Sequence, residues 1–153
     1  MDGSAVPSII AGRTSACCAL PRTGRGQGGA DMIEMLKERV NRDAGLVRRG
    51  RYLTTTFLLE IGKTDWLIAI HEGRVMAVTK GPFVMPSWSF ALRTSDEEWD
   101  RFCELRPPPG SNDLMALIKR RALKAEGELQ IFMANLRYFK EALGKLRREG
   151  VPA

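Results

Sequence analysis

Apolar and polar positions alternate most clearly between Phe57 and Thr94. In this stretch short apolar runs are separated by Gly, Pro and Asp, and the acidic sequence SDEEW follows directly. The pattern predicts a helix at SDEEW, preceded by four strands at 57–61, 66–70, 74–79 and 88–93. Several of the runs are apolar on both faces, so both sides of the expected sheet need to be covered or filled.

The turn between the second and third strands, HEG before Arg74, is compatible with two registers. Gly73 supplies the positive φ that such a hairpin requires. A two-residue turn pairs Ile70 with Val75, whereas a three-residue turn with a bulge pairs Ile70 with Arg74. A slip of one residue turns every side chain of a strand to the opposite face, so the sequence leaves open which face is inward.

Helical patterns lie on both sides of this strand region. The sequence MIEMLKERV predicts a helix from Met32, with an inner face of Met32, Met35, Leu36 and Val40. The basic segment between Gly45 and Gly50 is typical of a turn. After the fourth strand, Ser95 and Glu98 have the spacing of a capping box.

A Pro-rich connector, 107–109, separates this helix from the C-terminal part of the chain. A further helix follows, and residues 123–127 could form a fifth strand. The final helix is expected to carry a continuous apolar stripe, widened by Met133, of Leu129, Phe132, Leu136, Phe139, Leu143 and Leu146. Its length is short for an independent coiled coil, so packing on the sheet is favoured and we expect a monomer or weak dimer.

Three motifs in this order carry a resemblance to a known family. They are W-x-I-x-I-x-x-G at Trp66–Gly73, the strand-to-helix junction at 94–102, and KAEGE at Lys124–Glu128. Over about residues 33–147 the chain resembles the sterol carrier protein 2 (SCP2) family. The resemblance implies an α+β fold, in which a five-stranded mixed, mainly antiparallel sheet is packed with helices and an apolar tunnel runs between the layers.

The resemblance also implies a function, because members of that family bind fatty acyl chains, acyl-CoA, sterols or isoprenoids. We therefore expect non-catalytic binding or carrying of such a lipid in the interior tunnel. For any single residue that would line it, an ordinary filled core is the better explanation, and the case for a ligand rests on the residues taken together. The expected lining is Trp66, Ile68, Ile70, Met76, Val78, Trp88, Phe90, Leu92, Leu117, Ile118, Met133, Leu136 and Phe139.

Catalytic and metal-binding patterns are weak in this sequence. His71 is the only histidine and sits at a turn, where its neighbour Glu72 is expected to point to the opposite face. An acidic run such as 96–100 is common at a helix N-terminus, because its negative charges interact favourably with the helix dipole. We therefore expect no enzyme activity, no cofactor and no bound metal. The three cysteines form no C-x-x-C motif, which fits a cytoplasmic location.

The net charge of +6 is concentrated at the C-terminal end, where residues 113–153 carry nine Lys and Arg against five Asp and Glu. Such a basic face is either simply solvated or meets an anionic membrane surface or CoA phosphates. Nucleic acid is not an expected partner, because the aromatic residues do not alternate with the basic ones.

The chain of 153 residues is long enough for one domain with its own core. We expect a disordered leader or upstream extension at 1–31, a lipid-binding domain at 32–149 and a tail at 150–153. A second interpretation of the same domain is an accessory interaction module that supports a partner enzyme and has no ligand of its own.

Overall fold

The computed structural model describes residues 32–147, so the predicted leader at 1–31 and tail at 150–153 lie outside the described residues. Five strands form one sheet in the order β3-β2-β1-β4-β5. β1 pairs with β4 in parallel and the other pairs are antiparallel, which confirms the predicted mixed, mainly antiparallel α+β architecture. The strands are β1 (Thr55–Ile61), β2 (Thr64–His71), β3 (Arg74–Lys80), β4 (Phe90–Thr94) and β5 (Leu123–Gly127).

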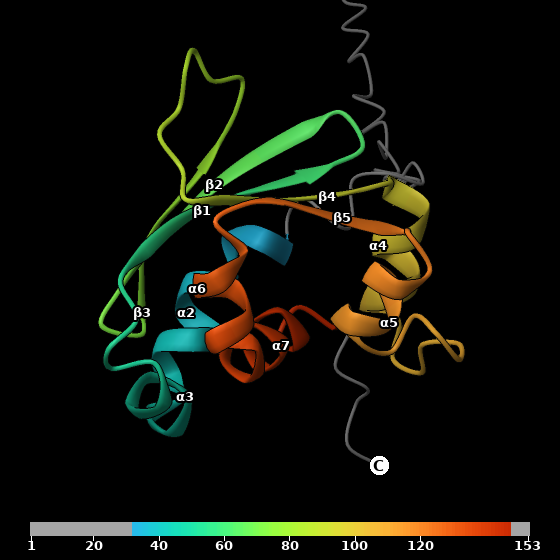
Figure 1. Cartoon of the computed structure of the whole chain (residues 1–153). Coiled ribbons are helices and arrows are strands. Elements are labelled where there is room, and N and C mark those ends of the chain that lie inside the picture. The colour runs from blue at the N-terminus through green and yellow to red at the C-terminus, as the bar shows by residue number, and fades with distance from the viewer. Residues whose placement is uncertain (1–31, 148–153) are drawn as a thin grey trace, which may run out of the picture.

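The helices lie on one side of the sheet and form two groups (Figure 1). The first group consists of α2 (Leu36–Arg42), α3 (Ala44–Arg49), α6 (Leu129–Ala134) and α7 (Leu136–Gly144). The second group consists of α4 (Asp96–Cys103) and α5 (Leu114–Lys119), below the end of the sheet at which β4 leads into α4.

The β2–β3 hairpin has the two-residue turn, one of the two registers that the sequence allows. His71 pairs with Arg74 and Ile70 pairs with Val75. Glu72 and Gly73 form the turn with φ values of 49° and 76°. This left-handed conformation is the one that two-residue hairpin turns need for their twist.

A register shift follows directly after this turn. Ala69 pairs with Ala77, so Met76 is the extra residue of a bulge in β3. Val75 and Val78 therefore share the inward face with Ile70 and Ile68, whereas Met76 is 53% exposed.

An aromatic cluster fills the space between the centre of the sheet and the C-terminal helices. Phe57 and Phe90 pair across β1 and β4, and their rings stack with centroids 5.2 Å apart. Phe139 of α7 meets both rings edge-on, at 5.6 and 5.3 Å. Phe132 of α6 lies 5.5 Å from Phe90 and Phe139, and all four side chains are at most 1% exposed. Edge-to-face and stacked pairs of this kind fix the position of α7 on the sheet.

The opposite face of the sheet is partly polar. Arg93 of β4 places Nε 3.2 Å from a carboxylate oxygen of Glu60 on β1 and 3.3 Å from one of Glu126 on β5. Leu58 and Ala91, which pair across the same two central strands, are buried on this face. The apolar surplus seen in the sequence is thus used mainly on the helix-covered face.

The tip of the β2–β3 hairpin is fixed to the helices by a close backbone approach. A Cβ added to Gly73 would lie 2.6 Å from the carbonyl oxygen of Val47, and one added to Gly50 would lie 2.8 Å from the Gly73 Cα. The Tyr138 hydroxyl of α7 donates a hydrogen bond of 2.8 Å to the Gly73 carbonyl. Glycine is required at both positions because a side chain would push the hairpin away from α3.

Two expectations for the N-terminal helices need correction. Of the predicted inner face, Leu36 and Val40 are buried and Met32 packs against the core, but Met35 is 41% exposed, because a turn at Met35 interrupts the helix. Ile33 is the buried residue that the prediction missed. The segment at 45–50 was expected to be a turn, but residues Ala44–Arg49 form α3. Asp43 begins α3 by accepting a hydrogen bond from the Leu46 amide, a capping signal that the two glycines obscured.

The prediction of a single long C-terminal helix was also wrong. Asn135, with φ −112° and ψ 23°, separates α6 from α7. Phe132, Phe139, Leu143 and Leu146 of the predicted stripe are buried as expected. Leu129 and Met133 are 38% and 51% exposed, so Met133 does not widen the buried stripe.

Candidate functional site

The thirteen residues predicted to line a ligand space fall into three groups. Seven are buried on the inner face of the sheet or on the helices that cover it: Trp66, Ile68, Ile70, Phe90, Leu92, Leu117 and Phe139. Three more, Val78, Ile118 and Leu136, are partly buried and pack against the core. Met76 and Met133 are about half exposed, and Trp88 is half-buried.

Trp88 precedes β4 rather than lying in it, because the strand begins at Phe90 and not at the predicted residue 88. Its ring covers Gly127 at the end of β5, where an added Cβ would lie 2.9 Å from Trp88 Cζ3. Trp88 therefore packs against the end of β5.

The structure adds residues to this layer that the sequence reasoning missed. Phe57, Val75 and Tyr138 are each at most 1% exposed. Val75 could have been found from the two-residue turn, since that register turns it inward. Tyr138 has no such signal, because its position depends on the Gly73 carbonyl, 65 residues away in the sequence.

Burial raises the pKa of Tyr138 to about 12. The phenol is thereby held in its neutral form, which is the form that donates to Gly73. This group is structural, because its one polar atom is already occupied by the hairpin tip.

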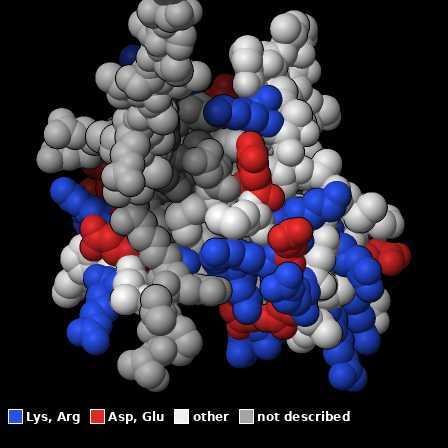
Figure 2. All heavy atoms as spheres, turned by 180° about the vertical axis from the view of Figure 1, so that it is seen from behind, with Lys and Arg blue, Asp and Glu red and all other residues white. Residues whose placement is uncertain are grey.

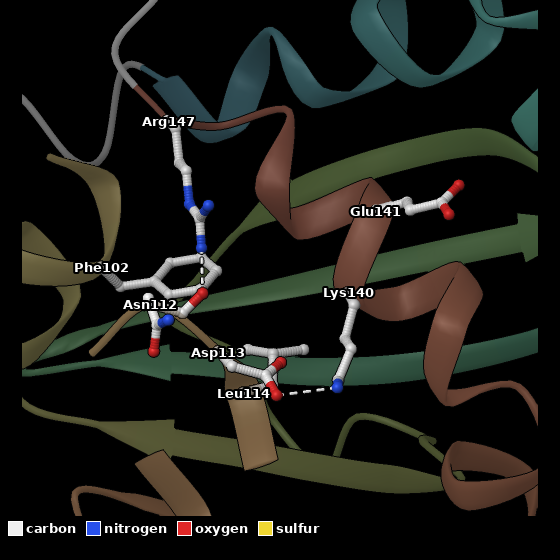
Figure 3. A pocket seen from close by; sticks show the side chains of 7 residues that line it. All are labelled: Phe102, Asn112, Asp113, Leu114, Lys140, Glu141 and Arg147. Carbon is white, nitrogen blue, oxygen red and sulfur yellow. Dashed lines mark hydrogen bonds and ion pairs between the residues drawn. The ribbon is translucent and has the colours of Figure 1, made fainter. Parts of the chain in front are cut away.

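A first hollow, of about 180 Å³, lies between the two helix groups (Figure 3). Phe102 of α4 and Leu114 of α5 form its apolar wall, and Lys140 and Glu141 of α7 lie opposite. Lys140 makes an ion pair of 2.7 Å with Asp113. We call this hollow the seam pocket.

The remaining charges of the seam pocket are also occupied. Arg147 stacks on Phe102 with its guanidinium carbon 5.0 Å from the ring centroid, and it donates to the Asn112 carbonyl. Glu141 is paired with Arg49 and Arg137. The charged groups of the pocket wall therefore have partners within the protein. The exception is the Arg147 Nε, which is buried without an acceptor among the described residues.

A second hollow, of about 400 Å³, is lined by Arg39, Arg42, Asp43, Ala44 and Lys145. Lys145 lies 2.7 Å from the Asp43 carboxylate, and Arg39 donates to the Lys145 carbonyl at 2.5 Å. The hydrogen bond from Lys145 and that from the Leu46 amide lower the pKa of Asp43 below its ordinary value. The charged residues of this second hollow thus join α3 to the end of α7.

A third hollow, also of about 400 Å³, runs along the edge strand β3. Trp66 and Val78 supply its apolar wall, Met76 and Ala77 continue it, and Glu34, Lys37 and Lys80 lie at its rim. The amine of Lys80 lies 5.6 Å from the centroid of the Trp66 ring. We call this hollow the β3 groove. Three of the predicted lining residues, Trp66, Met76 and Val78, meet here.

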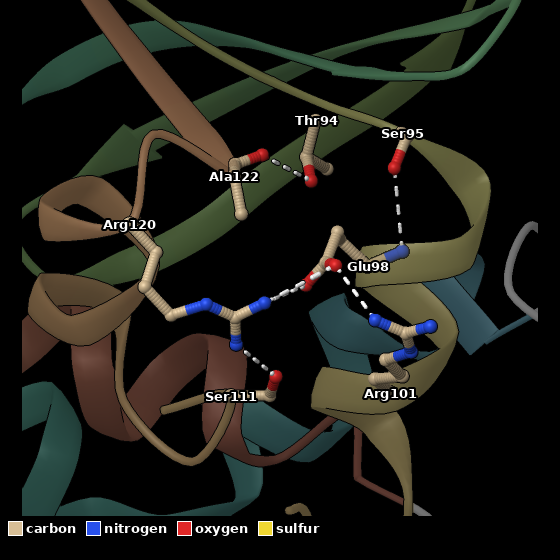
Figure 4. Close-up of polar contacts among 7 residues, drawn as sticks. All are labelled: Thr94, Ser95, Glu98, Arg101, Ser111, Arg120 and Ala122. Carbon is tan, nitrogen blue, oxygen red and sulfur yellow. Dashed lines mark hydrogen bonds and ion pairs between the residues drawn. The ribbon is translucent and has the colours of Figure 1, made fainter. Parts of the chain in front are cut away.

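A polar network joins α4 to the turn after α5 (Figure 4). Ser95 accepts a hydrogen bond of 3.3 Å from the Glu98 amide, which is one half of the predicted capping box. The other half is absent, because the Glu98 carboxylate accepts from Arg101 and Arg120. Arg120 also donates to the buried Ser111 hydroxyl at 3.0 Å. These contacts hold the second helix group together.

The basic C-terminal segment is largely neutralised by neighbouring carboxylates. Figure 2 shows Lys and Arg interspersed with Asp and Glu over the helical half of the molecule seen from behind. Lys119 and Arg121 are exposed and have no carboxylate partner within the described residues. Five ion pairs account for other cations: Arg120–Glu98, Lys124–Glu126, Arg137–Glu141, Lys140–Asp113 and Lys145–Asp43.

Groups with catalytic potential are sparse over residues 32–147. No cluster of three His, Cys, Asp or Glu there could hold a metal ion. His71 is exposed at the hairpin, where its Nδ1 lies 3.4 Å from the Thr54 hydroxyl. Cys103 of α4 is buried in the core. No helix in the described part of the chain is long and apolar enough to cross a membrane.

No protein-family model matches this sequence, and no curated protein matches it either. Solved structures do match the fold. A crystal structure of sterol carrier protein 2 has a TM-score of 0.64 at 9% identity, over 78% of this chain and 96% of that one. The solution structure of the sterol carrier protein domain 2 of Helicoverpa armigera has a TM-score of 0.56 at 16% identity, over 81% of this chain and 93% of that one.

A third solved structure, described as "UbiJ-SCP2 Ubiquinone synthesis protein", has a TM-score of 0.51 at 15% identity. It covers 78% of this chain and 95% of that chain. At these identities the similarity concerns the fold alone. It agrees with the sheet order, the parallel β1–β4 pair and the helices on one face. The chain therefore has the fold of the sterol carrier protein 2 domains.

Proposed function

We propose that this protein binds and carries a long apolar molecule without changing it covalently. The observation that carries the proposal is the single apolar layer between sheet and helices, on a fold that sterol carrier protein 2 domains share. Transfer of a ligand's apolar surface from water into this layer is favourable by about 25 cal/mol per Å².

Leu136 tests the interior placement. It is partly buried at the start of α7 and packs against the core. Leu136→Arg places a charge at the proposed ligand surface and is expected to abolish uptake of a fluorescent fatty acid. Leu129→Arg on the more exposed part of α6 adds the same charge and is expected to leave uptake unchanged.

Circular dichroism shows whether each variant is folded. A folded Leu136→Arg protein that takes up the fatty acid as the wild type does would contradict an interior site. Native mass spectrometry of the freshly purified full chain gives the complementary measurement. A bound mass of a few hundred daltons, typical of one lipid, supports the proposal.

A second candidate function is an accessory module that supports a partner enzyme. The aromatic cluster favours it, because Phe57, Phe90, Phe132 and Phe139 occupy the centre of the layer at van der Waals contact. The similarity to a domain of a ubiquinone synthesis protein favours it as well. Absence of any bound mass, together with no uptake of fatty acid or fatty alcohol, would select this candidate over a carrier.

A further inference from the structure

Positive charge without a partner is concentrated on α2, on α3 and on the turn after α3. Between Arg39 and Arg51 five of the thirteen residues are arginine. Among the described residues, only Arg49 of these five has a carboxylate partner, which is Glu141 of α7. We call the other four the arginine surface: Arg39, Arg42, Arg48 and Arg51.

The fold brings these four arginines together. Arg39 and Arg42 line the second hollow with Ala44, the first residue of α3. Arg48 follows Ala44 by one helical turn and therefore lies on the same side of α3. Arg51 lies two residues beyond the last residue of α3. The four positive charges are thus spread along two helices and a turn, and a ligand that meets all of them has to be extended.

The arginine surface is open to solvent over most of its extent. Arg42, Arg48 and Arg51 are exposed, and Arg39 is half-buried. The guanidinium carbon of Arg51 lies 4.5 Å from the centroid of the Tyr52 ring, and Tyr52 is 86% exposed. Arginine and tyrosine are enriched at protein interfaces and among the residues that dominate their affinity. An exposed, stacked pair of the two is therefore typical of a surface that contacts another protein.

Two other classes of anionic partner fit this surface less well. A helix that binds a membrane turns an apolar face to the lipid, but here Leu36, Val40 and Leu46 of α2 and α3 are buried in the core. A nucleic acid carries a negative charge at every nucleotide, and Glu38 and Asp43 lie among the arginines. A protein segment can place carboxylates opposite the arginines and neutral residues opposite these two carboxylates.

We propose that the arginine surface binds an acidic segment of a partner protein. Arginine presents its donors as a planar fork that matches the two oxygens of a carboxylate, so Asp or Glu side chains along an extended segment would each meet one guanidinium. This surface lies on the outside of α2 and α3, so the proposal is independent of whether the layer between sheet and helices carries a ligand. It gives the accessory module a place to dock its partner.

Fluorescence anisotropy with the full chain tests this, using a labelled peptide of alternating Glu and Ala. The salt concentration is about 0.1 M, at which charges more than about 10 Å apart are largely screened. In Arg42→Gln/Arg48→Gln/Arg51→Gln, the affinity for this peptide is expected to fall about tenfold, from the loss of three exposed charge contacts. Arg39 is left in place because it donates to the Lys145 carbonyl. A peptide of alternating Gln and Ala is expected not to bind the wild type.

The matched control is Lys63→Gln/Lys119→Gln/Arg121→Gln. It removes the same charge from three exposed residues outside the arginine surface. Lys119 ends α5, which lies across the helical layer from α3 (Figure 1). This control is expected to bind the Glu–Ala peptide as the wild type does. Circular dichroism and urea unfolding show whether both triple variants are folded, and uptake of a fluorescent fatty acid is expected to be the same in both.

The outcomes that would overturn the proposal are distinct from those that concern the carrier function. Equal weakening by the two triple variants would mean that only net charge matters, and no binding of the Glu–Ala peptide by the wild type would remove the surface altogether. Tighter binding of an oligothymidylate, or of vesicles of phosphatidylcholine with phosphatidylserine, that is lost in the arginine variant would assign the surface to a nucleic acid or a membrane. Failure of fatty acid uptake in the wild type would contradict the carrier function alone.

Discussion

The side-chain amide of Asn41 makes two hydrogen bonds to the backbone of Val75. Its Nδ2 donates to the Val75 carbonyl at 3.0 Å, and the Val75 amide donates to its Oδ1 at 2.9 Å. A neighbouring strand would make the same pair of bonds. Since β3 is an edge strand, Asn41 of α2 occupies the edge at the point where the bulge begins.

Asn41→Leu should leave both backbone groups of Val75 without their partner. We expect a loss of about 1–3 kcal/mol in the free energy of unfolding, measured by urea denaturation. Asn112→Leu serves as the control, because the Asn112 side chain is exposed, and it should change that free energy by less than about 0.5 kcal/mol. Equal effects of the two substitutions would show that the Asn41 bonds add nothing to stability.

Tyr138 should titrate well above an ordinary tyrosine, because burial raises its pKa to about 12. In Tyr52→Phe, which leaves Tyr138 as the remaining one of the two tyrosines, absorbance at 295 nm should therefore rise near pH 12. A rise near pH 10 in a protein still folded by circular dichroism would contradict this.

The same shift has a consequence for stability. In the unfolded chain the phenol loses its proton near pH 10, whereas in the folded chain it keeps it until about pH 12. The unfolded state then binds fewer protons, so stability is fully present below pH 10 and falls between these values. Tyr138→Phe should remove this part of the pH dependence and lose the hydrogen bond to Gly73, at about 1 kcal/mol.

Ser95→Ala tests the start of α4. The Ser95 side chain accepts from the Glu98 amide, and its loss should cost about 1 kcal/mol in thermal or urea unfolding. Glu98 stays bound to Arg101 and Arg120 in this variant, so the helix group should keep its arrangement. The exposed Ser87 provides the matched control, and Ser87→Ala should be neutral. A neutral Ser95→Ala would mean that Glu98 alone fixes the helix start.

Gly73→Ala should be more damaging than any of these changes. Its φ of 76° disfavours a side chain, and the new Cβ would lie 2.6 Å from the Val47 carbonyl oxygen and the Gly50 carbonyl carbon. We expect a loss of more than about 2 kcal/mol in unfolding free energy. Gly144→Ala, at a helix position with nothing within 4 Å, should instead gain up to about 1 kcal/mol. Equal stability of both variants would contradict the idea that the close approach at Gly73 fixes the hairpin tip to the helices.

Local signals in the sequence predicted local structure well. The Ser95 cap, the Gly73 turn and the fifth strand at 123–127 depend on neighbouring residues, so their patterns are complete in the sequence. The break at Asn135 was missed because the three-and-four spacing of apolar residues continues across it. Asn135 takes a non-helical conformation that the spacing alone cannot reveal.

The candidate site was predicted less completely than the fold. Trp66, Ile68 and Ile70 were placed on the right strand. Whether they point inward depends on the register of the hairpin, and the sequence is compatible with two different turns that give two registers. The bulge at Met76 could not be read at all, since it arises from how β3 pairs and not from its composition. The rim lysine of the β3 groove on the N-terminal helix, Lys37, was missed because it reaches the groove only through tertiary packing.

The parallel pairing of β1 with β4 sets the order in which the sheet is completed during synthesis. β1, β2 and β3 pair through short turns, so their ladder closes early, whereas β4 must first cross the sheet through residues 81–89. Until the chain has been made through Thr94, the seven-residue edge of β1 stays open to other chains. We therefore expect nascent or truncated chains that end before Phe90 to aggregate through β1.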